Sequence, residues 1–122
     1  MDKKILIIED EESLRSLLCD ELIAENFNVL AAGNGVDGLR LSLEERPDLI
    51  LLDIMMPDMD GNEVLEKLRS DDWGKKVHVI ILTNLSTSKQ LSKSLELGAF
   101  EYYVKSNLKI ESLIEKINKY LK

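Results

Sequence analysis

The feature that most restricts the fold of this chain is a fivefold alternation of short apolar runs with longer segments of helical pattern. The apolar runs predict strands at 4–9, 29–32, 49–52, 77–82 and 100–104. Leucines and isoleucines three or four residues apart predict helices from Ser13 to just before Asn26, then at 36–45, 61–70, 89–97 and 110–120. Strands that alternate with helices form a parallel sheet covered on both faces, with right-handed crossovers. The sequence therefore predicts an α/β fold, one doubly wound (βα)5 sandwich, with Leu17 of the first helix and Leu39 and Leu43 of the second on inner helix faces.

The central strand has the clearest boundaries. Four apolar residues, 49–52, run directly into the carboxylate of Asp53. Pro47 disfavours helical geometry in the residue before it, and Pro57 together with Asp60-Gly61 turns the chain afterwards. A short apolar run between such breakers predicts a strand buried on both faces, as in a parallel sheet. Asp53 is therefore expected at the carboxyl end of the third strand.

Reactive side chains follow four of the five predicted strands. They are Glu9 and Asp10 at the end of the first strand, Asp53 after the third, Thr83 after the fourth and Lys105 after the fifth. The carboxyl ends of parallel strands share one edge of the sheet, where open α/β sheets bind ligands. If the first and third strands are neighbours, the ends that carry Asp10 and Asp53 lie roughly 5 Å apart.

Three carboxylates so close require a cation or a retained proton. Each pair at ~4 Å repels by about 4 kcal/mol at an effective dielectric constant of ~20. Oxygen ligands without histidine or cysteine favour a hard ion such as Mg²⁺, and the only histidine, His78, begins the fourth strand at the opposite end. Asp53 as nucleophile, with Mg²⁺, Thr83 and Lys105 around the phosphoryl oxygens, is the set that phosphoryl transfer onto a carboxylate requires.

Each of these residues also has an ordinary structural explanation. Glu9 and Asp10 can place negative charge at the start of the first helix, Asp53 can cap a turn, and Thr83 can cap a helix. Lys105 can be a solvated surface charge. All of these explanations would have to hold together on one edge of the sheet, so the joint pattern favours a functional site.

At this point the sequence resembles the receiver domain of two-component response regulators. The resemblance covers the whole chain and is carried by four stretches: Ile8-Glu9-Asp10-Glu11, 52–61 around Asp53, Leu82-Thr83, and 97–105 ending at Lys105. It implies a flavodoxin-like fold with strand order 2-1-3-4-5, an order for which a receiver protein is a standard example.

The resemblance also implies roles for individual residues. Asp53 would accept a phosphoryl group from a histidine kinase, and Thr83 and Lys105 would contact it. Asp10, Asp53 and the Met55 carbonyl would bind Mg²⁺ or Mn²⁺, with Glu9 acting largely through water. Tyr102 would be the switch aromatic, whose rotamer follows Thr83.

Three positions depart from the usual receiver pattern. Glu9 stands where an aspartate is common, Ser106 follows the lysine in place of proline, and Asn84 is larger than the usual residue after the threonine. Because a cis bond before a residue other than proline costs ~3 kcal/mol, we expect a trans or visibly strained Lys105–Ser106 bond. Our hypothesis is that Asn84 and Met55 alter how readily water reaches an acyl phosphate on Asp53.

We therefore expect a phosphorylation-activated signalling switch, read on the face formed by the fourth helix, fifth strand and fifth helix. It would catalyse only its own phosphorylation and dephosphorylation. One alternative is an aspartyl-phosphate phosphatase of the haloacid dehalogenase type, but its Asp-x-Asp motif would need an aspartate at Met55. A flavin carrier would need a phosphate loop where the acidic residues 9–12 stand. A phosphate-independent interaction module with the same fold remains the main alternative.

Composition limits the partners and the compartment. The 122 residues carry a net charge of −7, which gives no general attraction for nucleic acid or an anionic membrane surface. A single cysteine, Cys19, and the absence of a signal peptide or a long apolar run predict a cytoplasmic protein. We expect residues 1–122 to be one receiver domain without an output domain. The expected partners are a histidine kinase or phosphotransfer protein and an unknown downstream protein. The exposed last helix leaves room for a second copy, although nothing specific in the sequence demands one.

Overall fold

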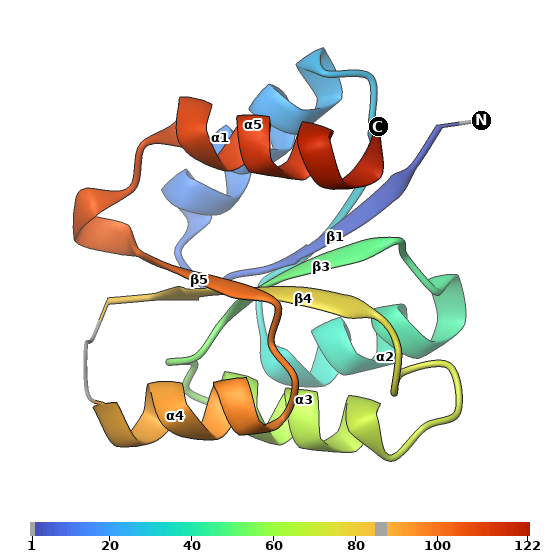
Figure 1. The fold of residues 1–122 in the computed structure, drawn as a ribbon, viewed down its shortest axis with the longest axis vertical. Coiled ribbons are helices and arrows are strands. Elements are labelled where there is room, and N and C mark those ends of the chain that lie inside the picture. Colours follow the sequence, from blue (N-terminus) through green and yellow to red (C-terminus); the bar gives the residue numbers. More distant parts are fainter. Residues whose placement is uncertain (1, 85–87) are drawn as a thin grey trace.

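The protein is an α/β sandwich built on one five-stranded parallel sheet, as the sequence predicts (Figure 1). The computed structural model describes residues 2–84 and 88–122. The strands are β1 (Lys4–Ile8), β2 (Asn28–Ala32), β3 (Leu49–Asp53), β4 (His78–Thr83) and β5 (Glu101–Val104). The helices are α1 (Glu12–Ala24), α2 (Gly35–Glu45), α3 (Gly61–Arg69), α4 (Ser88–Glu96) and α5 (Ile110–Leu121), with a 3₁₀ turn, η1 (Lys105–Asn107), after β5. The strand order β2-β1-β3-β4-β5 confirms the predicted order.

The helices cover the two faces of the sheet unequally. Figure 1 shows α1 and α5 on one face and α2, α3 and α4 on the other. Alternate residues of each strand point to opposite faces, so Leu6 and Ile8 of β1 belong to the core beneath α2–α4. Ile5 and Ile7 belong to the core beneath α1 and α5. Every residue of β3 is buried, which explains why residues 49–52 are an unbroken apolar run before Asp53.

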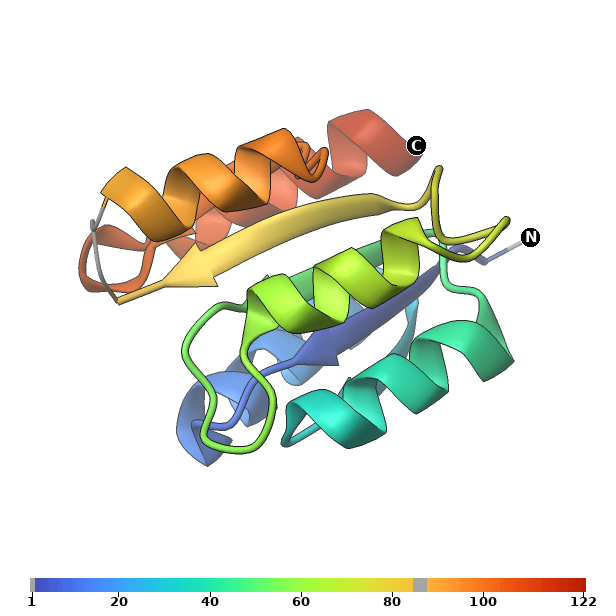
Figure 2. The same ribbon diagram turned by 90° about the horizontal axis from the view of Figure 1, so that it is seen from below.

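The strand register brings the carboxyl ends of four strands together. Ile8 of β1 pairs with Leu52 of β3, so residues 9 and 53 follow this pair on adjacent strands. Across the next pair Asp53 lies opposite Leu82, and Thr83 lies opposite Val104 at the end of β5. Figure 2 shows β1 and β4 running in the same direction. The reactive residues of the sequence therefore share one edge of the sheet.

Two leucines that the pattern places on inner helix faces are exposed instead. Leu17 of α1 and Leu43 of α2 have 44% and 39% of their surface accessible. The buried residues of α2 are Gly35, Gly38 and Ser42, and at Gly38 the helix lies too close to β1 for a larger side chain. A Cβ atom on Gly38 would lie 2.6 Å from Cγ2 of Ile8. Leu39 is partly buried against the core, as predicted, so the leucine spacing was wrong for Leu43 and right for Leu39.

The remaining differences lie at the ends of the elements. β1 ends at Ile8, one residue earlier than predicted, and β4 is shifted by one residue to His78–Thr83. The hydroxyl-rich loop 83–88 also predicts a cap for α4 from its last residues, and this prediction falls on residues 85–87, outside the described part of the chain. Among the described residues, none of the helices has the length and apolar character needed to cross a bilayer.

Candidate functional site

The side chains of Glu9, Asp10 and Asp53, which we call the acidic site, converge at the carboxyl edge of the sheet. One carboxylate oxygen from each residue lies within 4.8 Å of the other two. Asp53 is the last residue of β3, and the other two directly follow β1, which is its neighbour in the sheet. Glu9 and Asp53 are almost fully buried, whereas Asp10 is exposed. The closeness expected from strand order is therefore present in the structure.

Lys105 places its ammonium group between two of these carboxylates. Its Nζ lies 2.6 Å from Oε1 of Glu9 and 3.1 Å from Oδ2 of Asp53, and only 7% of the lysine side chain is exposed. Burial lowers the pKa of Lys105, but the hydrogen bond to Glu9 and the charges of Asp53 and Glu9 outweigh it and raise the pKa. The lysine is therefore a fixed cation at the site.

Glu9 is held more firmly than its expected role through water would require. Besides the contact of Oε1 with Lys105, its Oε2 accepts the backbone N–H of Glu11 at 2.9 Å. The backbone carbonyl of Glu9 accepts a bond from Nη1 of Arg15 at 2.8 Å. Glu9 therefore fixes the start of α1 and the position of Lys105 at the same time.

Asp53 retains a proton more readily than an ordinary aspartate. Its burial, the charge of Glu9 and a hydrogen bond with Asp10 raise its pKa to about 7, although Lys105 acts in the opposite direction. Oδ1 of Asp53 accepts the backbone N–H of Met55 at 3.1 Å, which turns the chain after β3. Three carboxylates against one ammonium leave an excess of negative charge, and a hard divalent cation fits this set of oxygen donors.

Thr83 and Tyr102 lie on the same side of the sheet. Thr83 ends β4 and is almost fully buried, whereas Tyr102 on the edge strand β5 is 40% exposed. Tyr102 pairs with Ile81, which belongs to the core beneath α2–α4, so both residues face the side that α4 covers. Tyr103 points the other way and packs against the core beneath α1 and α5.

Comparison with known proteins gives the family. The response regulator receiver domain matches residues 5–118 of the chain. The chain belongs to this family. Sporulation initiation phosphotransferase F of Bacillus subtilis is 36% identical over 99% of this chain and 95% of its own length. The receiver domain also spans half or less of several transcriptional regulators that it matches.

Solved structures agree with this assignment. A receiver domain protein from Methanospirillum hungatei JF-1 has a TM-score of 0.92 at 30% identity, over 99% of this chain and 94% of its own. The receiver domain of a sensor histidine kinase from Pseudomonas aeruginosa PAO1 has a TM-score of 0.87 at 24% identity, over 98% and 97% of the two chains. That second structure has a magnesium ion coordinated in its active site cleft.

The departures from the usual receiver pattern have clear places in the structure. No peptide bond in the described residues is cis, so the bond between Lys105 and Ser106 is trans, and Ser106 lies exposed in η1. Asn84 and Met55 are also exposed, each one or two residues beyond a strand end that supplies the site. His78 lies at the amino end of β4, away from the acidic site, where it is hydrogen-bonded to the Tyr120 hydroxyl.

Two residues form hydrogen bonds that hold the backbone around the acidic site, and neither of them was predicted from the sequence. Arg15 bonds to the carbonyl of Glu9, and Asp58 bonds to the first turn of α2. A helical pattern gives no reason to single out Arg15, and Asp58 lies in a turn where acidic residues are common. Asp58 contacts residues 22 and 23 positions away, so no local signal marks it.

Proposed function

We propose that this receiver domain is a phosphorylation-activated switch in which Asp53 is the phosphoryl acceptor. The observation that carries the proposal is the position of Asp53: a buried carboxylate in a cluster of three acids, 3.1 Å from the Lys105 ammonium. Such an arrangement holds one oxygen ready to attack phosphorus and supplies positive charge for the oxygens that arrive with it.

Transfer of the phosphoryl group forms one bond to phosphorus and breaks another. A carboxylate oxygen of Asp53 forms a bond to phosphorus while the bond from phosphorus to a histidine nitrogen of the donor breaks. Lys105 then exchanges part of its contact with Asp53 for a phosphoryl oxygen, and the Thr83 hydroxyl donates to another. Glu9 keeps Lys105 oriented throughout, because it lies 2.6 Å from the ammonium.

The acidic site would hold one Mg²⁺ ion, or Mn²⁺ in its place. Asp10, Asp53 and the Met55 carbonyl would bind it directly, and Glu9 would act through water or through Lys105. The bound ion supplies positive charge that offsets the phosphoryl oxygens. The donor set of this chain and the magnesium ion in the Pseudomonas receiver domain support this assignment.

The altered state would be read on the face formed by α4, β5 and α5. Thr83 and Tyr102 share the side of the sheet that α4 covers, so a movement of the threonine toward the phosphoryl group frees space that the tyrosine can enter. Receiver domains obtain the phosphoryl group from histidine kinases or phosphotransfer proteins. For this chain we propose one such donor and a downstream protein that binds the α4–β5–α5 face, and the exposed side of α5 is available to a second copy.

Phosphorylation by a small donor tests the proposal. We expect protein incubated with Mg²⁺ and acetyl phosphate to gain the mass of one phosphoryl group, and beryllofluoride to give a matching spectral change. Asp53→Ala should abolish both, whereas Asp20→Ala, which removes an exposed carboxylate of α1, should change neither. A wild-type protein that gains no mass would instead favour a phosphate-independent interaction module.

A further inference from the structure

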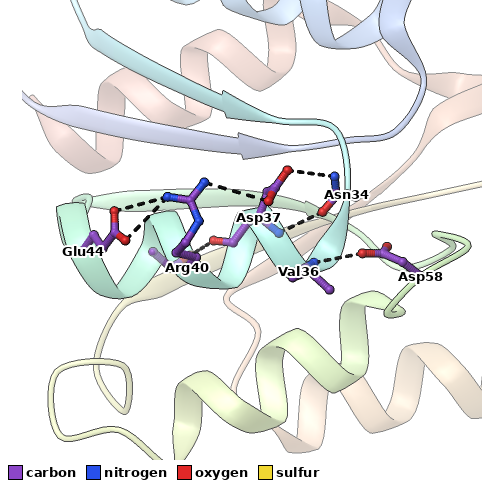
Figure 3. Close-up of polar contacts among 8 residues, drawn as sticks. Asn34, Val36, Asp37, Arg40, Glu44 and Asp58 are labelled. Atoms are coloured by element: carbon purple, nitrogen blue, oxygen red, sulfur yellow. Dashed lines mark hydrogen bonds and ion pairs between the residues drawn. The ribbon is translucent and has the colours of Figure 1, made fainter.

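The loop between β3 and α3, residues 54–60, is fixed to the rest of the protein at two points. At its base the backbone N–H of Gly61 donates to the carbonyl of Ile54 at 2.7 Å, which closes the loop on itself. At its tip the two oxygens of Asp58 accept the backbone N–H groups of Gly35 at 3.1 Å and Val36 at 3.0 Å. Figure 3 shows Asp58 beside Val36 at the first turn of α2. Asp58 is thus bonded to residues that precede it by more than twenty positions in the chain.

The first turn of α2 is well suited to hold a carboxylate. Amides at the start of a helix have no partner within the helix, and the positive end of the helix dipole lies there. Asn34 caps one of these amides by accepting the N–H of Asp37 at 2.8 Å, and Asp58 serves two others. The bonds from Val36 and Gly35 hold the pKa of Asp58 below its ordinary value.

The contact is also a close fit between two backbones. A Cβ atom on Gly35 would lie 2.4 Å from the carbonyl oxygen of Met59, so the loop backbone rests directly on the start of α2. Asp58 itself is exposed, and exposed charge pairs contribute little to overall stability. The contact therefore matters most for where it holds the loop.

We propose that Asp58 is a positioning residue for the cation site, because it holds the 54–60 loop on α2 and so keeps the Met55 carbonyl beside Asp53 before a cation arrives. The inference rests on the proposed function. Met55 is three residues from Asp58, and its N–H is already bonded to Asp53 at 3.1 Å. With both neighbours fixed, the carbonyl has little freedom to lose on binding, and a preorganised ligand binds more tightly.

Three variants separate position from charge. Asp58→Ala removes both bonds and one negative charge. Asp60→Ala is its matched control, since Asp60 lies in the same loop, carries the same charge and caps a helix by accepting the N–H of Glu63 at 2.9 Å. Val36→Pro removes one of the two donors and changes no charge. Proline is tolerated in the first turn, and Gly35 before it has no Cβ to clash with the ring.

Two measurements then test the inference. By isothermal titration calorimetry with Mg²⁺ alone, we expect the Kd to rise roughly tenfold in Asp58→Ala and about threefold in Val36→Pro. In Asp60→Ala it should rise less than about twofold, and the difference should persist in high salt, where exposed charges are screened. In cation-free protein, hydrogen exchange of the 54–59 amides should be faster in Asp58→Ala and Val36→Pro but not in Asp60→Ala.

The outcomes distinguish this inference from the function on which it rests. Equal effects of Asp58→Ala and Asp60→Ala, or a Val36→Pro variant with unchanged Mg²⁺ affinity and loop exchange, would overturn the positioning role alone. Wild-type protein that binds no Mg²⁺ would overturn the proposed function and the inference together.

Discussion

The two ends of the sheet balance their charged side chains in opposite ways. At the carboxyl end, Glu9, Asp10 and Asp53 share the single ammonium of Lys105. At the other end, the guanidinium of Arg69, from the last turn of α3, forms no ion pair within the described residues. It donates instead to four backbone carbonyls, those of Leu97 (2.7 Å), Gly74 (2.6 Å), Val77 (2.9 Å) and Gly98 (3.0 Å).

The difference separates a structural charge from a functional one. The carbonyl partners of Arg69 are permanent parts of the backbone, so its charge is satisfied whatever else binds. The acidic site is left with more negative charge than Lys105 can balance, and burial together with the charge of Glu9 raises the pKa of Asp53 to about 7. A buried cluster that is incompletely satisfied is poised for a ligand, whereas a fully satisfied one only holds elements together.

The largest expected effect on stability comes from Arg69, at the amino end of the sheet. Arg69→Met should lower the free energy of unfolding by about 3 kcal/mol, because four carbonyls lose a charged donor, yet it should leave Mg²⁺ affinity unchanged. Urea unfolding and calorimetry would measure the two quantities. Lys67→Met removes an exposed charge from the same helix and should change stability by less than about 0.5 kcal/mol. A variant that loses both stability and cation affinity would break the comparison.

Cation binding at the acidic site should raise the free energy of unfolding of the protein by a similar amount. At a concentration a hundredfold above the Kd, Mg²⁺ should raise the free energy of unfolding at pH 8 by about 2.7 kcal/mol. Asp10→Ala should lose most of this gain, and Glu12→Ala, with an exposed carboxylate outside the acidic site, should keep it. Equal stabilisation of both variants would place the cation elsewhere.

Neutralising Asp53 should stabilise the cation-free protein. The pKa of Asp53 is raised in the folded state, so the folded state binds its proton more tightly than the unfolded chain does. Stability is therefore lost as the pH rises from about 4 to about 7, and Asp53→Asn should recover about 2 kcal/mol at pH 8 and progressively less toward pH 4. Urea unfolding across this range would test the sign, with Asp20→Asn as a control that shows no such trend.

The smallest expected effect concerns the rim of the site. Asn84 is exposed directly after Thr83, and Asn84→Ala should open a path for water and shorten the lifetime of the phosphorylated protein by about threefold. Loss of the phosphoryl group can be followed by mass spectrometry. Asn28→Ala, at the opposite end of the sheet, should leave the lifetime unchanged. An unaltered lifetime in Asn84→Ala would remove this residue from the mechanism.

The acidic site was predictable because its members follow strands in the sequence and the sheet is parallel. Strand order and register then bring Asp10, Asp53 and Lys105 to one edge without further information. The burial of Glu9 and its contact with Lys105 were not predictable, since the length of the side chain alone does not say which oxygens it meets. The roles of Asp10, Asp53 and Lys105 in phosphoryl transfer stay predictions.

The contacts that hold the framework could not be predicted in the same way. Arg69 donates to backbone carbonyls, and Asp58 accepts from backbone N–H groups. Every residue except proline carries both a carbonyl and an N–H, so the sequence does not mark the partner. The inner face of α2 was predicted only in part, for a related reason. Gly38 fits close to β1 because it lacks a side chain. The spacing of hydrophobic residues cannot predict a buried position that is occupied by glycine.

Gly61 brings the first turn of α3 into direct contact with the acidic site. A Cβ atom on this residue would lie 2.4 Å from the carbonyl oxygen of Asp53, so the first turn of α3 touches the main chain of Asp53 with no side chain between them. The next residue, Asn62, donates to the Gln90 carbonyl and accepts from Ser94, both in α4. A displacement at the end of β3 would thus reach α3 through main-chain contact at Gly61 and α4 through the side-chain hydrogen bonds of Asn62.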